Sequence, residues 1–333
     1  MRLLEFWNKV RKTPAKDWYY SLHPEHQTPN DIPTGQVKAN ASYINVHLKS
    51  MRIVNVRNGF KTFYPVVHSF ISLKYLGNSD AEFNVVTTPN QLAELDSSNL
   101  DRIISINKRL LGPTPYRGGD VLFDIGLFSV KSGDLSKPFL SLLTDMSNIA
   151  GVSFLGKALP FVDPISKGVD LLVGNTSAVE LEVGISTDNS QLIIGYYVLI
   201  ADDKQNVQRD KLFIDPSDFK LTDDKGTPFR SHPYLVLSIS TSDKKEDWFD
   251  IPELAAAYKK LQDNVRSGDI NAAKDSLTIF KRFVLTSNDL LSRDAKEIAV
   301  QVERETNDIL ATTQVAQVAP KQLRDLSAYI IYR

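Results

Sequence analysis

Between residues 43 and 240, hydrophobic and polar side chains alternate along several segments, which is the pattern of β-strands with one buried face. Clear alternating runs are Tyr43 to Val56, Val67 to Tyr75, Val121 to Leu127 and Val179 to Ile185. Asn58-Gly59 separates the first two runs and supplies the positive φ angles of a tight two-residue turn. We therefore predict a hairpin over residues 43–76, whose paired strands carry His47 and His68.

A second kind of strand is apolar on both faces. The run from Leu192 to Ile200 contains no charged residue, which is typical of a central strand in a sheet that is covered on both sides. Shorter strands are expected at residues 212–214 and 234–240. Near Ser50 the alternation of the first strand shifts by one residue, and such a shift predicts a β-bulge.

After Ile251 the hydrophobic period lengthens to that of an α-helix. The pattern predicts three helices. Gly268-Asp269 combines a C-cap glycine with an N-cap aspartate, so the first two helices should form a tight helical hairpin. Two further helices are expected near residues 138–173, each opening with a polar cap followed by a proline.

Together these elements predict an α+β protein with one β-sandwich domain and one helical region. An N-terminal arm, residues 1–37, precedes an antiparallel β-sandwich over residues 38–245, with the inserted helices near 138–173. A helical region follows at residues 251–309. Residues 310–333 are predicted to form a linker and a docking tail.

The N-terminal arm begins with a short amphipathic stretch that includes Phe6, Trp7, Arg11 and Lys12. A basic helix with aromatic residues can lie on an anionic membrane surface, so these four residues are the candidate membrane contacts. The apolar stretch 139–173 is a second candidate, although charged residues interrupt it too often for a membrane-spanning helix. For both segments, packing on the protein's own core is the favoured alternative.

The C-terminal tail gathers apolar side chains in its last residues: Leu323, Ile330, Ile331 and Tyr332. In a protein surrounded by water, an apolar terminus docks either on its own core or on a partner. We take these four residues as the candidate contacts with another protein.

Composition and charge narrow the function classes. The 333 residues include 39 basic and 40 acidic side chains and no cysteine, which excludes disulfides, thiolate metal sites and cysteine nucleophiles. Residues 1–131 carry 16 Lys and Arg against 11 Asp and Glu. This local excess falls short of the basic stripe typical of nucleic-acid binding, so no specific nucleic-acid partner is expected. The N-terminus lacks the apolar core of a signal peptide, and we predict a cytoplasmic protein.

Short catalytic motifs are missing from the sequence. It contains no nucleophile elbow, phosphate-binding loop, dinucleotide fingerprint or zinc-protease motif, which lowers the expectation of catalysis. Acidic residues do gather in the later loops, at Asp202, Asp203, Asp215, Asp218, Asp223 and Asp224. Calcium prefers such oxygen clusters, but the lysines and arginines among them favour solvated loops. We predict no cofactor and keep calcium as the alternative.

Two carboxylates, Asp120 and Asp124, are candidates for a hydrolase. Four positions apart on one strand, they would share a face at about 13 Å from each other. This separation exceeds that of glycosidase carboxylate pairs, so each would need another partner.

One segment resembles a known group of proteins. The stretch from Tyr116 to Val130, which opens Tyr-Arg-Gly-Gly-Asp, and its continuation at 151–154 resemble a segment of uncharacterised bacterial proteins from protease-linked conflict or antiphage loci. The strands at 43–76 and 177–240 are similar to a C2-type sandwich in number and loop placement. The first resemblance implies a role in bacterial antiviral defence, and neither one assigns a residue.

The leading hypothesis for function is a non-enzymatic protein-interaction module, an adaptor or effector subunit that binds another protein. The absence of catalytic motifs motivates it. Two alternatives stay open, namely a membrane-active effector that a partner releases or triggers, and a hydrolase that uses carboxylates.

Overall fold

The computed structural model divides the chain into two compact units. It describes residues 17–21, 26, 34–53, 57–58, 61–74, 80–86, 103–131, 179–189, 191–201, 207–316, 322–329 and 331. One unit comprises Met1–Ala39 and Ile44–Thr241, and its described residues form mainly strands. The other comprises Asn40–Tyr43 together with Ser242–Arg333, and its helices lie in the second segment.

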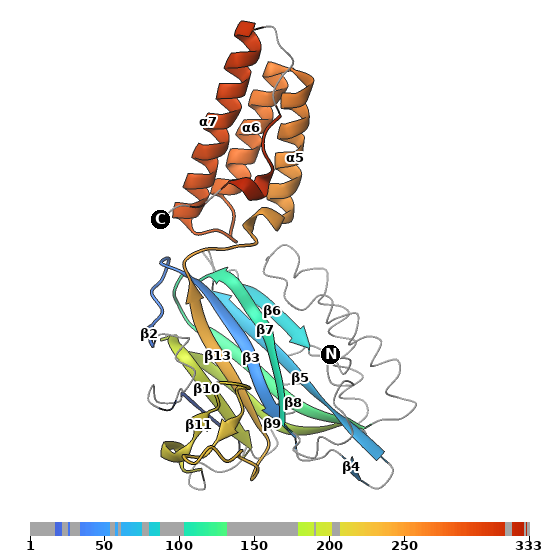
Figure 1. The fold of residues 1–333 in the computed structure, drawn as a ribbon, viewed down its shortest axis with the longest axis vertical. Coiled ribbons are helices and arrows are strands. Elements are labelled where there is room, and N and C mark those ends of the chain that lie inside the picture. Colours follow the sequence, from blue (N-terminus) through green and yellow to red (C-terminus); the bar gives the residue numbers. More distant parts are fainter. Residues whose placement is uncertain are drawn as a thin grey trace. The chain divides into compact units, whose positions relative to one another are not determined.

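The strand unit contains a six-stranded and a five-stranded sheet (Figure 1). The six-stranded sheet has the order β1-β10-β13-β3-β7, with β2 also paired to β10. These strands are β1 (Asp17–Ser21), β2 (Gly35–Gln36), β3 (Tyr43–Arg52), β7 (Ile103–Pro115), β10 (Ile193–Ala201) and β13 (Tyr234–Ser242). Strand β10 is antiparallel to each of its partners β1, β2 and β13.

The five-stranded sheet has the order β4-β5-β8-β9, with β6 also paired to β5. Its strands are β4 (Arg57–Asn58), β5 (Lys61–Lys74), β6 (Asp80–Val86), β8 (Val121–Lys131) and β9 (Val179–Asn189), and all their pairings are antiparallel. A separate two-stranded ribbon joins β11 (Phe213–Ile214) to β12 (Leu221–Thr222), after a short 3-10 helix at Arg209–Lys211.

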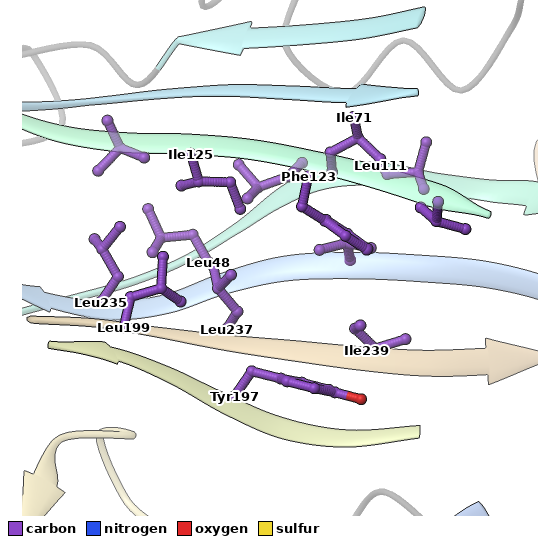
Figure 2. Packing of buried hydrophobic residues seen from close by; sticks show 14 of the residues in the cluster. Leu48, Ile71, Leu111, Phe123, Ile125, Tyr197, Leu199, Leu235, Leu237 and Ile239 are labelled. Carbon is purple, nitrogen blue, oxygen red and sulfur yellow. The ribbon is translucent and has the colours of Figure 1, made fainter. Parts of the chain in front are cut away.

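One hydrophobic core lies between the two large sheets, as Figure 2 shows. The predicted inward set of β8 is confirmed, because Val121, Phe123, Ile125 and Leu127 all belong to this core. From the six-stranded sheet, β3, β10 and β13 contribute side chains such as Leu48, Leu199 and Leu237. The two sheets therefore form a β-sandwich, and the predicted α+β class with a C-terminal helical region is correct.

Strands β10 and β13 are buried on both faces, as predicted for the run from Leu192 to Ile200. Tyr197 and Leu199 of β10 enter the core between the sheets. Their neighbours Tyr196, Val198 and Ile200 belong to a second cluster on the opposite face. That second cluster also includes Leu212, Ile214 and Leu221, so the segment around the β11–β12 ribbon covers the outer face of the six-stranded sheet.

The predicted hairpin over residues 43–76 is wrong. Strand β3 belongs to the six-stranded sheet and β5 to the five-stranded sheet, so His47 and His68 do not lie on paired strands. Only the tip of the predicted hairpin forms, where β4 pairs with the start of β5. The inward positions of the first strand do shift as predicted, from Leu48 to Met51. Alternation shows which face of a strand is buried, but it does not identify the partner strand.

The helical unit contains α5 (Pro252–Ser267), α6 (Ile270–Leu285) and α7 (Ser292–Ala316), after a short 3-10 helix at Trp248–Asp250. The predicted helical hairpin is confirmed: Gly268 ends α5 in the left-handed conformation, and the Asp269 side chain caps α6 by accepting from the Ala272 amide at 3.0 Å. Helix α7 continues to Ala316, past residue 309 where the helical region was expected to end. The expected helices near 138–173 lie outside the described residues.

The start of α7 holds the two segments through which the chain enters the helical unit. Arg293 donates from Nη1 to the Ala41 carbonyl and from Nη2 to the Asp243 carbonyl, both at 2.8 Å. The Tyr43 hydroxyl donates to Asp294 at 2.5 Å and accepts from the Leu291 amide at 3.1 Å. Burial, and then the hydrogen bond to Asp294, raise the pKa of Tyr43. Residues far apart in sequence are thus joined through a buried hydroxyl.

Gly112 of β7 lies against the backbone of the neighbouring strand β3. Its φ of +98° is a conformation that side chains disfavour, and a Cβ atom built on it would lie 2.1 Å from the Ile44 carbonyl oxygen. By contrast, Gly226 has a φ of +76° with no atom within 4 Å of such a Cβ. A comparison of substitutions at the two glycines therefore distinguishes the cost of backbone strain from the cost of a steric collision.

We expect Gly112→Ala to lower the free energy of unfolding by more than about 2 kcal/mol, because the strands must separate locally to admit the methyl group. The matched control Gly226→Ala should cost about 1 kcal/mol, the strain of the backbone alone. Chemical denaturation of both variants measures the difference. Equal losses would show that β7 and β3 are not this close at Gly112.

Candidate functional site

The predicted tail residues pack inside the helical unit where the structure describes them. Leu323 and Ile331 are buried, together with Leu326 and Tyr329 around the 3-10 turn at Leu326–Ala328. Ile330 and Tyr332 lie outside the described residues. Of the two destinations open to the tail, its own core accounts for Leu323 and Ile331.

Hydrogen bonds and charge fix the tail in this position. The Tyr258 hydroxyl of α5 lies 2.7 Å from the Arg324 carbonyl oxygen and 2.8 Å from the Tyr329 hydroxyl. The Arg324 guanidinium pairs with Glu305 of α7 at 2.8 Å and lies 4.0 Å from the centre of the Tyr329 ring. Burial raises the pKa of Tyr329 to about 12. The tail therefore joins α5 to α7.

Several large apolar side chains of the helical unit stay exposed. They are Ile279, Phe283 and Leu285 on α6 and Val300 on α7, with exposed fractions of 41, 44, 50 and 62%. Ile279 and Phe283 are one turn apart and share one face of α6. They lie outside the buried stripe of that helix, whose members include Leu277, Phe280 and Val284. An exposed apolar pair on a regular helix is a candidate contact surface.

The acidic loop residues that the structure describes are used to build turns. Asp215 accepts from the amide of Ser217 at 2.7 Å, and Asp223 accepts from the amides of Lys225 and Thr227 at 2.9 and 2.8 Å. The pKa of both carboxyl groups is lowered. For Asp215 the largest cause is a hydrogen bond from the Ser217 hydroxyl, and for Asp223 it is the hydrogen bond from the Thr227 amide.

The remaining acidic candidates do not complete a metal site. Asp218 pairs with Lys220 at 2.6 Å, and Asp224 is exposed. Asp202 and Asp203 lie outside the described residues. Within the described ranges, no three His, Asp or Glu side chains gather as metal ligands would. The calcium alternative thus has no support from the residues that can be placed.

A row of polar and small residues crosses the outer face of the five-stranded sheet. His68 of β5 pairs with Gly126 of β8, which pairs with Gly184 of β9. Asp124 lies two residues along β8 on the same face, about 7–8 Å from His68 by the diagonal spacing of a sheet. Both side chains are 1% exposed. Asp124 was a candidate from the sequence, but its closeness to His68 could not be predicted, because β5 and β8 are far apart along the chain.

Glu182, one of the polar residues in the alternating run from Val179 to Ile185, is buried as well. A register irregularity lies next to it, since Val183 pairs with Leu127 while Leu181 pairs with Phe128. The extra residue at such a bulge is displaced from the regular alternation. The strict period-two pattern therefore does not describe its burial.

Burial lowers the pKa of His68 to about 4, so its imidazole is neutral at neutral pH. Asp120, which precedes β8, remains partly exposed. Between the sheets, a cavity of about 10 Å³ is lined by seven apolar or aromatic side chains, among them Phe123, Tyr197 and Leu237. It has the size of about one water molecule and its apolar lining favours a dry void. This void is too small for an organic substrate.

The candidate membrane contacts Phe6, Trp7, Arg11 and Lys12 lie outside the described residues, as does the stretch 139–173. In the part of the chain that the structure describes, none of the helices combines the length and apolar character that crossing a membrane requires. No family model, curated protein or solved structure matches the chain.

Removing the Tyr329 side chain should destabilise the helical unit. We expect Tyr329→Ala to lower the free energy of unfolding by about 3 kcal/mol, since a buried ring is lost. Tyr329→Phe should cost about 1 kcal/mol, the hydrogen bond to Tyr258 alone. Ser327→Ala, at an exposed position of the same turn, is the control in urea unfolding followed by circular dichroism. Unchanged stability of Tyr329→Ala would show that the tail is not docked in solution.

Acidification should weaken the fold through His68. Its folded pKa is about 4 and its ordinary value 6.5, so the unfolded chain takes up the proton first as the pH falls. This contribution is fully present above pH 6.5 and is lost as the pH falls toward 4, by about 3 kcal/mol in all. We expect His68→Gln to show a smaller pH dependence of unfolding than the natural protein between these values. Identical slopes would contradict the assignment.

Proposed function

We propose that the protein is a non-enzymatic protein-interaction module, an adaptor or effector subunit, and that its helical unit contacts the partner. The observation that carries this proposal is the exposed pair Ile279 and Phe283 on α6. Phenylalanine is enriched in protein interfaces and depleted from solvated helix faces, where it keeps apolar area in water. Burying both side chains against a partner would remove this area from water.

The surroundings of the pair support a protein partner. Apart from Leu285 at the C-terminal end of α6, the remaining large apolar side chains of that helix are buried or partly buried, and Asp275 and Arg282 flank the pair on the exposed face. An apolar centre with a charged rim is the usual composition of a protein interface. In this proposal the tail residues Leu323 and Ile331 stabilise the contact surface from within instead of forming it.

The cellular setting is proposed from the sequence. The absence of cysteine fits a reducing compartment, and we propose a cytoplasmic setting. The resemblance of residues 116–154 to proteins of bacterial defence loci suggests that the partner is another component of such a system. Proteins expressed from genes beside this one are thus the first to test.

The experiment replaces the apolar pair without touching the core. We expect the natural protein to co-purify with a stoichiometric partner, and Ile279→Gln combined with Phe283→Gln to weaken that complex at least about tenfold, as loss of central contacts does. Val300→Gln, at an apolar position on α7 that is more exposed than either member of the pair, is the matched control and should bind normally. Circular dichroism should show the same helical content in all three proteins.

Two results would overturn this proposal. One is a complex whose affinity is the same in the double variant and the natural protein. The other is a natural protein that remains strictly monomeric and binds none of the neighbouring gene products in direct measurements with purified components.

A further inference from the structure

A cluster of basic side chains lies on the outer face of the six-stranded sheet. His47 and Lys49 are two residues apart on β3 and share a face, while Val46 and Leu48 point into the sandwich core. The neighbouring strand β7 carries Arg109, which is exposed and close enough to His47 to act on it electrostatically. The cluster is therefore assembled across two strands.

The Lys49 side chain is held in place, unlike an ordinary surface lysine. It is 8% exposed, and its ammonium lies 4.5 Å from the centre of the Phe219 ring. The next residue, Ser50, donates from its hydroxyl to the Phe219 carbonyl at 2.6 Å. The chain thus fixes the position of Phe219 beside Lys49 from both its ring and its backbone.

Phe219 itself is strained. Its φ of +60° lies in the left-handed region, which is rare and unfavourable for a bulky residue. Its amide donates to the Asp215 carbonyl at 3.0 Å, and its ring stacks with Tyr196 at 6.4 Å between centroids. The turn therefore holds an unfavourable backbone conformation that places an aromatic ring under a cation.

The two charges that act on the pKa of His47 are both positive. Burial first, and then Lys49 and Arg109, lower the pKa of His47 to about 4. Its imidazole is thus neutral at neutral pH and offers one N–H donor. The Asp218 carboxylate, in the same turn as Phe219, is engaged by Lys220 at 2.6 Å. Two cations and a neutral donor therefore lie on neighbouring positions of this face.

We propose that His47, Lys49 and Arg109 bind the phosphoryl group of a small phosphorylated ligand. Lys49 and Arg109 supply the positive charge, and the His47 N–H adds a hydrogen bond to a phosphoryl oxygen. The cluster is compact, with three side chains on two adjacent strands, whereas a nucleic-acid backbone needs a longer basic stripe. The net charge of −1 over the chain also disfavours a polyanion.

Pyrophosphate is the probe for this site, with inorganic phosphate as a smaller one. We expect pyrophosphate to bind the whole 333-residue chain in calorimetry and to raise the pKa of His47 in an NMR titration, because the bound anion offsets both cations. Arg109→Gln, at an exposed position, should weaken binding about tenfold through loss of a charged hydrogen bond. Lys49→Met keeps the apolar stem over Phe219 and should weaken binding at least as much. Lys274→Gln, exposed on α6, is the control and should bind like the natural protein.

Three results would overturn the proposal. The first is that neither phosphate nor pyrophosphate binds or moves the His47 signals. The second is that Arg109→Gln and Lys49→Met, both folded by circular dichroism, bind pyrophosphate like the natural protein. The third is that a single-stranded oligonucleotide binds through the same residues far more tightly, with the steep salt dependence of several phosphate contacts, which would assign the face to nucleic acid instead.

Discussion

The strand unit depends on the burial of β10 and β13 on both faces. One face of each strand meets the five-stranded sheet across the core, and the other requires a cover of its own. The segment around the β11–β12 ribbon provides that cover. The hydroxyl of Tyr234 on β13 accepts a hydrogen bond from the Leu221 amide of this segment at 3.3 Å. Burial raises the pKa of this tyrosine, so its hydroxyl stays protonated throughout the range in which proteins function. A segment that is rich in charged residues is therefore a structural layer of the sandwich.

This requirement explains the role of the acidic residues in that segment. A short chain that covers a sheet must reverse direction often, and Asp215 and Asp223 make those reversals by accepting nearby amides. Their oxygens are consequently directed at the backbone. The same turn that contains Asp215 places Phe219 beside Lys49, so the cover also shapes the cluster of His47, Lys49 and Arg109.

The sequence predicts what depends on neighbours along the chain. The inward face of β8, the two-sided burial of β10 and the cap between α5 and α6 were all predicted, because periodicity and capping residues determine them locally. Strand partners were not, since β3 and β5 have similar patterns but belong to different sheets. The approach of His68 to Asp124 follows from strand pairing and carries no local signal. The exposed pair on α6 was also missed, because helical periodicity marks the buried stripe and says little about the residues beside it.

The hydroxyl of Tyr43 gives the helical unit a discontinuous origin. Tyr43 is synthesised long before α7. Its hydroxyl can bond to Asp294 and to the Leu291 amide only after those later residues have been made. A fragment that starts at Ser242 would contain every helix and still leave the Asp294 carboxylate and the Leu291 amide without this hydroxyl, and Arg293 without the Ala41 carbonyl. The helices should therefore complete their packing late in synthesis. Excising them as an independent domain, for expression or for fusion to another protein, requires a short peptide carrying Asn40–Tyr43 as well.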